Sequence, residues 1–221
     1  MKRVLVLRPE PGASATVERA RLLGLDAAAT PLFEIEPVKW NAPDPNGFDG
    51  LLLTSANAVR YGGEQLKLLL ELKAYAVGEA TANSARDSGF DVATSGDYGV
   101  DALLSSLPKG LKLLHLCGSD RRQAELRDQE ITSVIVYRSR QIDAPDLSFA
   151  TDCVALIHSP RAGTRLAELV RERCSIEIAA ISKAAADAAG SGWASIHVAH
   201  RPTDEALLAL AARLCNKPEP K

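Results

Sequence analysis

The sequence predicts an α/β protein made of two doubly wound, parallel-sheet domains related by an internal repeat. Short, continuously apolar segments alternate with segments whose apolar residues follow helical spacing. Strands that lack polar alternation are typical of sheets covered on both faces, and a βαβα order favours parallel pairing. The same order of segments also occurs twice, 104 residues apart over most of its length.

The repeat is visible in matching apolar strand segments. Residues 50–55 correspond to 154–159, residues 74–78 to 178–182, and the polar–apolar segment 101–104 to 205–208. With a drift of a few residues, 4–8 corresponds to 113–117, and the stretch around Pro31 to that around Tyr137. Each half therefore offers five strand candidates.

Helices are expected between these strands. Apolar spacing predicts helices over 14–23, 80–88, 164–173 and 204–214, the last with Thr203 as its N-cap. The proline-rich stretch 37–47 is typical of a connector, with a counterpart at 143–148. Ligands of doubly wound sheets bind beyond the carboxyl ends of the strands, so candidate site residues are sought there.

Composition limits the classes of function. The 221 residues suit one large or two small domains, and 46% apolar with 24% charged residues is typical of a globular chain. The net charge of -2 provides no basic field for nucleic acid or an anionic membrane, so neither is expected as a partner.

Cysteine use and the N-terminus indicate the compartment. The four cysteines lie far apart without a C-x-x-C motif, and residues 4–7 are too short an apolar run for a secretory signal. No stretch approaches the ~18 uncharged apolar residues of a membrane span. We therefore expect a soluble, cytoplasmic protein with reduced thiols.

Two strand-to-helix junctions at equivalent positions of the repeat carry candidate binding residues. Ser55 with Asn57 follows one strand, and Ser159 with Arg161 follows its counterpart. Either serine can simply cap its helix, but a helix N-terminus also favours a carboxylate or phosphate, and Arg161 adds a fixed positive charge.

A second pair of junctions differs between the halves. Gly78 allows close backbone approach and Thr81 offers a hydroxyl in the first helical turn. In the other half Ser182 replaces the glycine, Lys183 follows it, and Ala185 replaces the threonine. Lys183 is either a solvated side chain or a cation placed for an anion.

Two further residues end apolar strands. Tyr137 follows 134–136 and is either a packing residue or a phenol at the rim of the sheet. Arg8 follows 4–7 and is either a surface ion-pair partner or a ligand clamp.

Several chemistries lack their motifs. No strand is followed by G-x-x-x-x-G-K-[ST] or G-x-G-x-x-G, and the four histidines form no H-E-x-x-H, so neither a nucleotide cofactor nor a metal is expected. No G-x-S-x-G surrounds Ser55 or Ser159.

The ordered motifs taken together resemble the uroporphyrinogen-III synthases over nearly the whole chain. They are Arg8-Pro9, Thr54-Ser55-Ala56-Asn57-Ala58-Val59, Val77-Gly78-Glu79-Ala80-Thr81-Ala82, Leu116-Cys117-Gly118, Val136-Tyr137, Ser159-Pro160-Arg161-Ala162-Gly163 and Pro202-Thr203. The resemblance implies two flavodoxin-like domains joined by a two-stranded linker. One domain would hold 1–37 plus 143–221 and the other 41–139, whereas the repeat alone suggests a cut near residue 109.

The activity implied by the resemblance is that of a cofactor-free hydro-lyase. Such an enzyme cyclises hydroxymethylbilane, received from the preceding deaminase, with inversion of the last pyrrole ring, and acts as a monomer. Tyr137 would then assist loss of the hydroxyl. The substrate would be bound by residues at the strand ends and helix starts, namely Arg8, Ser55, Asn57, Gly78, Thr81, Ser159, Arg161, Ser182, Lys183 and Thr203.

Two other functions fit the same fold. One is a non-catalytic two-domain protein that closes on a polycarboxylate or tetrapyrrole ligand. The other is a flavodoxin-like regulatory or redox module, although neither an acidic receiver cluster nor a flavin phosphate loop is recognisable. Ser182 and Ala185 depart from the family pattern, which leaves a catalytically weak homologue as a further alternative.

Overall fold

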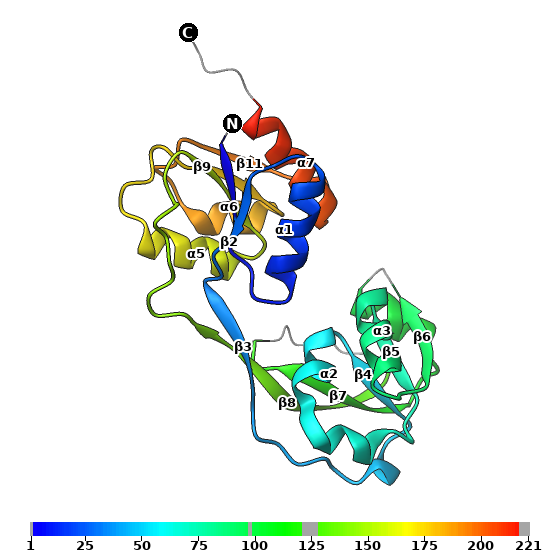
Figure 1. Ribbon diagram of the computed structural model, residues 1–221. Helices are drawn as coiled ribbons and strands as arrows, with labels where there is room; N and C mark the ends of the chain where they lie inside the picture. The colour runs from blue at the N-terminus through cyan, green and yellow to red at the C-terminus, as the bar shows by residue number, and fades with distance from the viewer. Residues whose placement is uncertain (1, 97–98, 121–127, 217–221) are drawn as a thin grey trace. The chain divides into compact units, whose positions relative to one another are not determined.

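The computed structural model of the chain describes residues 2–96, 99–120 and 128–216. It divides into two compact units, shown with their elements in Figure 1. Unit 1 is discontinuous and comprises Met1–Glu34 and Gln141–Lys221, while unit 2 is Ile35–Arg140. The chain therefore leaves unit 1 after its first strands, builds unit 2, and returns.

Unit 1 contains a five-stranded parallel sheet in the order β11-β10-β9-β1-β2. This is the flavodoxin-like order, and its switch point lies between β1 and β9. Val4 of β1 lies opposite Ala27 of β2 on one side and opposite Val154 of β9 on the other. The strands are β1 (Arg3–Val6), β2 (Ala27–Ala29), β9 (Cys153–Ile157), β10 (Glu177–Ala180) and β11 (Ser195–Val198).

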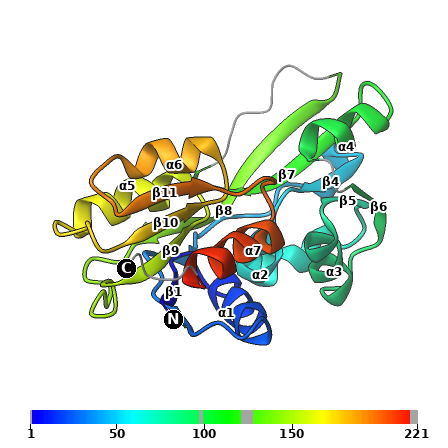
Figure 2. The ribbon, with the colours of Figure 1, turned by 90° about the horizontal axis from the view of Figure 1, so that it is seen from above.

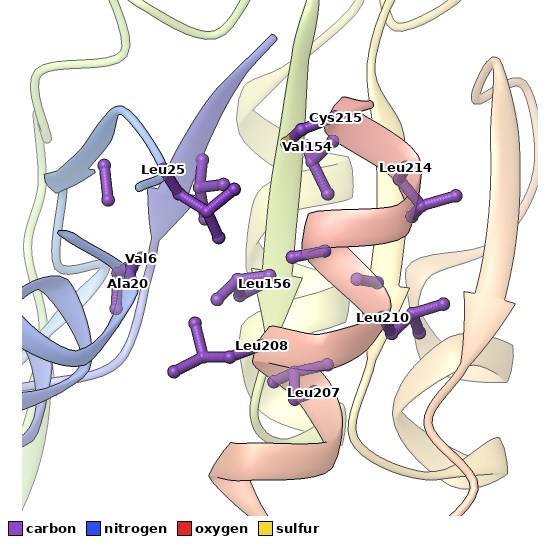
Figure 3. Close-up of a cluster of buried hydrophobic side chains, with 14 of the residues drawn as sticks. Val6, Ala20, Leu25, Val154, Leu156, Leu207, Leu208, Leu210, Leu214 and Cys215 are labelled. Atoms are coloured by element: carbon purple, nitrogen blue, oxygen red, sulfur yellow. The ribbon is translucent and has the colours of Figure 1, made fainter. Parts of the chain in front are cut away.

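Helices cover both faces of this sheet, as Figure 2 shows. The helices α1 and α7 pack on one face through the cluster in Figure 3, in which Leu207 and Leu208 lie near Leu156 of β9. The helices α5 and α6 cover the other face through residues such as Leu166 and Ala185. The bounds are α1 (Gly12–Leu22), α5 (Pro160–Leu169), α6 (Lys183–Ala189) and α7 (Asp204–Cys215).

Unit 2 repeats this plan with a different chain order. Its sheet runs β3-β8-β7-β4-β5-β6, so β4, β5 and β6 correspond to β9, β10 and β11, while β7 and β8 correspond to β1 and β2. The strands are β3 (Phe33–Pro37), β4 (Gly50–Leu53), β5 (Ala74–Val77), β6 (Val92–Gly96), β7 (Lys112–Gly118) and β8 (Glu130–Gln141). The equivalent switch point lies between β4 and β7.

One face of the unit 2 sheet is covered by α2, η2 and α3, and the other by α4. The bounds are η1 (Pro45–Gly47), α2 (Ala56–Gly62), η2 (Gly63–Leu69), α3 (Glu79–Asp87) and α4 (Val100–Ser106). Fully buried leucines of β4 face both layers, since Leu51 and Leu53 pack under α2 and Leu52 packs under α4.

The strands β3 and β8 lie side by side where the chain passes between the units. Their hydrogen bonds run in antiparallel register, because Val38 N donates to Val136 O and Ile142 N donates to Leu32 O, both at 3.0 Å. The fold thus has two parallel-sheet α/β units, and a two-stranded connection accompanies the crossing.

Candidate functional site

In unit 1 the candidate site lies at the switch point between β1 and β9. Arg8 follows β1, and His158 with Ser159 follows β9, so parallel pairing of the two strands brings these residues to one edge of the sheet. The helix α7 contributes Thr203 and Asp204 to the same edge, because Asp204 contacts His158 after β9 and Arg8 after β1.

Asp204 is the centre of a charged cluster at this edge. Its Oδ1 lies 2.8 Å from Nε2 of His158, and its Oδ2 accepts from Nη2 of Arg19 at 2.6 Å. The Thr16 hydroxyl donates to the same carboxylate at 3.1 Å, and Nη1 of Arg8 lies 3.5 Å from Oδ1. The side chain of Asp204 is only 17% exposed.

The pKa of Asp204 shows that these contacts outweigh its burial. Burial alone would raise that pKa, but the hydrogen bonds and charges of His158 and Arg19 lower it well below the usual range of an aspartic acid. The carboxylate therefore stays ionised throughout the neutral range and fixes the positions of its partners.

The hydroxyl residues of the predicted site act as helix N-caps. Ser159 Oγ accepts from Ala162 N at 3.2 Å, and Ser182 Oγ and Thr203 Oγ1 each accept from a backbone N–H at 3.3 Å. In unit 2 Ser55 Oγ accepts from Asn57 N at 3.2 Å. An oxygen that accepts in this way still carries an O–H, so capping leaves each hydroxyl able to donate to a ligand.

The two predicted cations near these caps have neighbours of their own. The Arg161 guanidinium lies over the Phe33 ring, 4.5 Å from its centroid. Lys183 Nζ pairs with Asp187 at 2.8 Å on the exposed surface of α6. Exposed pairs of this kind are weak, so Lys183 keeps the freedom to exchange its partner.

In unit 2 the switch point carries a different set of polar groups. Thr54 occupies the position equivalent to His158, and its hydroxyl lies 2.9 Å from Nε2 of the buried His115 of β7. Ser133 of β8 lies 3.4 Å from Nδ1 of the same ring. Described residues of unit 2 thus form a hydrogen-bonded row across β4, β7 and β8.

Gly78 and Thr81 begin α3 as the sequence predicts, but they differ in exposure. Gly78 has a φ of +81°, which only glycine adopts without strain, and a β-carbon there would meet no atom within 4 Å. Thr81 is 5% exposed and lies within the first turn of α3.

Tyr137 lies on β8 with its ring against Gly118, the last residue of β7. A β-carbon at Gly118 would lie 2.7 Å from the ring and 3.0 Å from the phenol oxygen. Only a glycine there leaves room for the ring, which is half-buried. Within the described ranges the phenol has no hydrogen-bond acceptor, so its O–H is available to a ligand.

The site residues therefore fall into two groups, one in each unit. Sequence reasoning missed the Asp204 cluster, because its members Arg8, Thr16, His158 and Asp204 come together only through the pairing of distant strands. The sequence does carry one signal for this cluster, because a histidine, His158, stands where the other half of the repeat has Thr54.

Two features are absent from the described residues. No three His, Cys, Asp or Glu side chains there gather in a way that could hold a metal ion. Among those same residues, no helix has the length and apolar character that crossing a membrane requires.

Comparison with known proteins identifies relatives over most of the chain. The family model described as uroporphyrinogen-III synthase HemD matches residues 14–209. A uroporphyrinogen-III synthase of Chlorobaculum parvum (strain DSM 263 / NCIMB 8327) is 34% identical over 101 residues, a match that spans 42% of this chain and 41% of that relative.

Solved structures resemble the fold over nearly its whole length. The uroporphyrinogen-III synthetase of Helicobacter pylori 26695 has a TM-score of 0.68 at 20% identity, covering 97% of this chain and 100% of that chain. A mutant uroporphyrinogen III synthase of the extremely thermophilic bacterium Thermus thermophilus has a TM-score of 0.51 at 17% identity, covering 98% of this chain and 100% of that chain. The two-unit architecture is thus shared with these proteins.

Proposed function

Because this chain belongs to the uroporphyrinogen-III synthase family, we propose that it cyclises hydroxymethylbilane to uroporphyrinogen III, inverting the terminal pyrrole ring and releasing one water. The match of the family model over residues 14–209 is the observation that carries this proposal. The reaction is a dehydration with rearrangement, so the enzyme is a hydro-lyase.

The substrate suits the strand ends of unit 1. Hydroxymethylbilane is a flexible chain of four pyrroles with acetate and propionate arms, so it presents carboxylates along its length. Arg8, Arg161 and Lys183 supply cations, and Ser159, Ser182 and Thr203 supply hydroxyls at helix starts. Charge-assisted hydrogen bonds from such groups bind carboxylates, which is how a chain of net charge -2 can hold a polyanion.

Unit 2 supplies groups for the reacting end of the substrate. Ser55, Asn57, Gly78 and Thr81 offer hydroxyl, amide and backbone donors at the ends of β4 and β5. Tyr137 offers a phenol that Gly118 positions and that no described residue accepts from. We assign Tyr137 as the group that donates to the departing hydroxyl.

The steps follow from loss of that hydroxyl. Tyr137 donates a proton to the hydroxyl, the hydroxymethyl C–O bond breaks and water leaves. The pyrrole nitrogen electrons form the new conjugated C=C and C=N system, and loss of the N–H proton gives a neutral azafulvene end. The far ring attacks this end through its substituted carbon to form a spiro intermediate. The bond from the spiro centre to the neighbouring ring's bridging carbon then breaks and leaves an azafulvene on that ring. The released ring turns and attacks this azafulvene through its unsubstituted carbon, and loss of the proton on that carbon, with return of a proton to the azafulvene nitrogen, gives the inverted product.

Positioning accounts for much of the acceleration. The two ends of an open tetrapyrrole meet in solution without help, but that closure gives the uninverted isomer I. Holding the chain in one folded geometry can supply several kcal/mol, ~7–11 in the best intramolecular cases. Donors fixed at strand ends and helix starts are suited to hold the arms in that geometry.

The resemblance also suggests the setting of the reaction. We propose a cytoplasmic monomer that receives its unstable substrate by transient hand-over from the preceding deaminase. Its product would enter tetrapyrrole biosynthesis.

The test supplies fresh hydroxymethylbilane from the preceding deaminase and separates the oxidised products as isomers I and III. Isomer III that rises with protein concentration is expected. Deaminase alone is the control and should give isomer I. Isomer I alone in the presence of folded protein would remove the proposal and favour a binding protein without catalysis.

A further inference from the structure

Arg8 is held against the start of α1 in unit 1 by one edge of its guanidinium. Its Nη1 lies 3.5 Å from both the Thr16 hydroxyl and Oδ1 of Asp204. Thr16 is fully buried and Asp204 is 17% exposed, so both partners have fixed positions. The Arg8 side chain itself is 34% exposed and is reachable by a ligand.

Gly12 provides the surface on which this guanidinium rests. A β-carbon at Gly12 would lie 2.6 Å from Nε, 2.8 Å from Cζ and 3.0 Å from Nη2 of Arg8, closer than real β-carbons approach other atoms, so Gly12 lies under the Nε–Nη2 side of the guanidinium. The backbone of Gly12 does not have the positive φ that demands glycine. To admit a β-carbon at Gly12, the Arg8 guanidinium would therefore have to shift from its present position.

The opposite edge of the guanidinium has no protein partner. Within residues 2–96, 99–120 and 128–216, neither Nε nor Nη2 of Arg8 has a hydrogen-bond acceptor. The nearby carboxylate of Glu10 accepts from Ser14 N and Ser14 Oγ, at 3.0 and 2.9 Å, rather than from Arg8. An Nε–Nη2 edge is the arrangement that binds a carboxylate through two parallel hydrogen bonds.

Asp204 anchors Arg8 without neutralising it. The carboxylate is shared, because Arg19 donates to Oδ2 from both Nε and Nη2, at 3.0 and 2.6 Å, and His158 and Thr16 also contact it. Arg8 is its most distant partner at 3.5 Å. In addition, the start of a helix disfavours a nearby cation, so Arg8 gains by meeting a further anion there.

We propose that Gly12 and Asp204 are positioning residues that seat the Arg8 guanidinium so that its Nε–Nη2 edge binds one carboxylate arm of the substrate. This rests on the proposed function for the identity of the carboxylate donor. Gly12 does so by lacking a β-carbon, and Asp204 by holding Nη1.

Gly12→Ala tests the seat without changing any charge. The added methyl group displaces the guanidinium, while alanine suits the first turn of α1 at least as well as glycine. Gly47→Ala is the matched control, since a β-carbon there meets no atom within 4 Å and Gly47 lacks a positive φ. Arg8→Lys, which keeps the charge but loses the planar fork, is the second variant.

Two readouts are measured with each variant: KM and kcat for hydroxymethylbilane, and equilibrium binding of uroporphyrin III by fluorescence titration. For Gly12→Ala we expect KM and the uroporphyrin Kd to rise ~10-fold, as for loss of a charge-assisted hydrogen bond, with kcat within about twofold and no fall in Tm. Arg8→Lys should raise both constants similarly, and Gly47→Ala should change neither.

If KM and Kd are unchanged in Gly12→Ala, Gly12 does not position Arg8 and the inference is wrong. Isomer III formation by the wild type would still support the proposed function. Wild-type protein that gives only isomer I would remove the proposed function, and the uroporphyrin titration would still test the seat. A fall in Tm of Gly12→Ala together with proportional loss of kcat would also contradict the inference, because it would show a structural role only.

Discussion

The two units share one sheet plan but differ in what their strands carry at the carboxyl ends. At the switch point of unit 1, Arg8 and Arg19 surround the carboxylate of Asp204. At the equivalent point of unit 2, the Thr54 hydroxyl lies 2.9 Å from Nε2 of His115, and Tyr137 rests on Gly118. One end is suited to hold anions and the other to donate a proton.

This difference shows which parts of a repeat are constrained by folding. The buried strands keep their apolar character in both units, because each is covered on both faces. The polar residues at the carboxyl ends, such as His158 and Thr54, are outside the hydrophobic core clusters, so they can differ between the units without loss of the fold. We therefore assign substrate carboxylates to unit 1 and the departing hydroxyl to unit 2.

Tyr137→Phe should have the largest effect. The phenylalanine ring can still rest on Gly118, so we expect a fall in kcat of about 100-fold, typical of losing an acid group, with little change in Tm. The rate of isomer III formation measures this. Tyr75→Phe is the matched control, since the Tyr75 ring also lies against a glycine, Gly50, in the same unit. Equal kcat in wild type and Tyr137→Phe would remove the assigned role.

Asp204→Asn should give the largest loss of stability. Its charge-assisted contacts with Arg19 and His158 are weakened, so we expect about 2 kcal/mol lower free energy of unfolding, measured in urea at pH 7. Asp187→Asn removes the exposed pair with Lys183 and is expected to cost less than about 0.5 kcal/mol.

The Asp204 effect should also depend on pH. The folded pKa of Asp204 lies below the unfolded value of ~3.9, so its stabilisation is fully present above that value and is lost as pH falls through the folded pKa. The difference in the free energy of unfolding between wild type and Asp204→Asn should therefore become smaller below about pH 4. If this difference in the free energy of unfolding stays constant down to pH 2, the ionised Asp204 carboxylate is not its cause.

Thr54→Val tests the hydrogen-bonded row of unit 2. The valine keeps the shape of the side chain but removes the hydroxyl that lies 2.9 Å from the buried His115 ring, so we expect a loss of about 1–2 kcal/mol. Thr132→Val, at an exposed position of β8, is the control and should leave stability nearly unchanged.

Among the variants of site residues, Ser159→Ala should have the smallest effect on the free energy of unfolding. It removes the N-cap of α5, which costs about 1 kcal/mol, and Ser55→Ala removes the equivalent cap of α2. If unit 1 binds the substrate carboxylates, KM should rise more in Ser159→Ala than in Ser55→Ala. If the KM values of both variants equal that of the wild type, the two serines only cap their helices.

Local signals in the sequence predict much of this fold. The apolar runs predict most ends of β1, β4, β5, β9 and β10 to within one or two residues. Thr203 caps α7 as expected. The edge strands β6 and β11 alternate in burial, so they lack the continuous apolar pattern that marks the central strands. The predicted helix 164–173 is instead α5 at Pro160–Leu169, because Ser159 and Pro160 form the start signal.

Contacts between distant segments could not be predicted in this way. The seat of Arg8 requires α1, β9 and α7 to meet, which follows from the pairing of β1 with β9. A cut near residue 109, suggested by the repeat alone, would separate these paired strands. Tyr137 was identified by its family motif, but its contact with Gly118 depends on the register of β7 and β8, which shifts at Cys117 and Gly118.

The most direct test of the division between units compares KM and kcat for Arg8→Met and Tyr137→Phe in the isomer III assay. Arg8→Met should raise KM about tenfold with kcat within threefold, as for loss of a carboxylate-binding group. Tyr137→Phe should lower kcat with KM within threefold. If Arg8→Met leaves KM unchanged, or if both variants lower kcat to the same extent, the assignment of binding to unit 1 and chemistry to unit 2 is wrong.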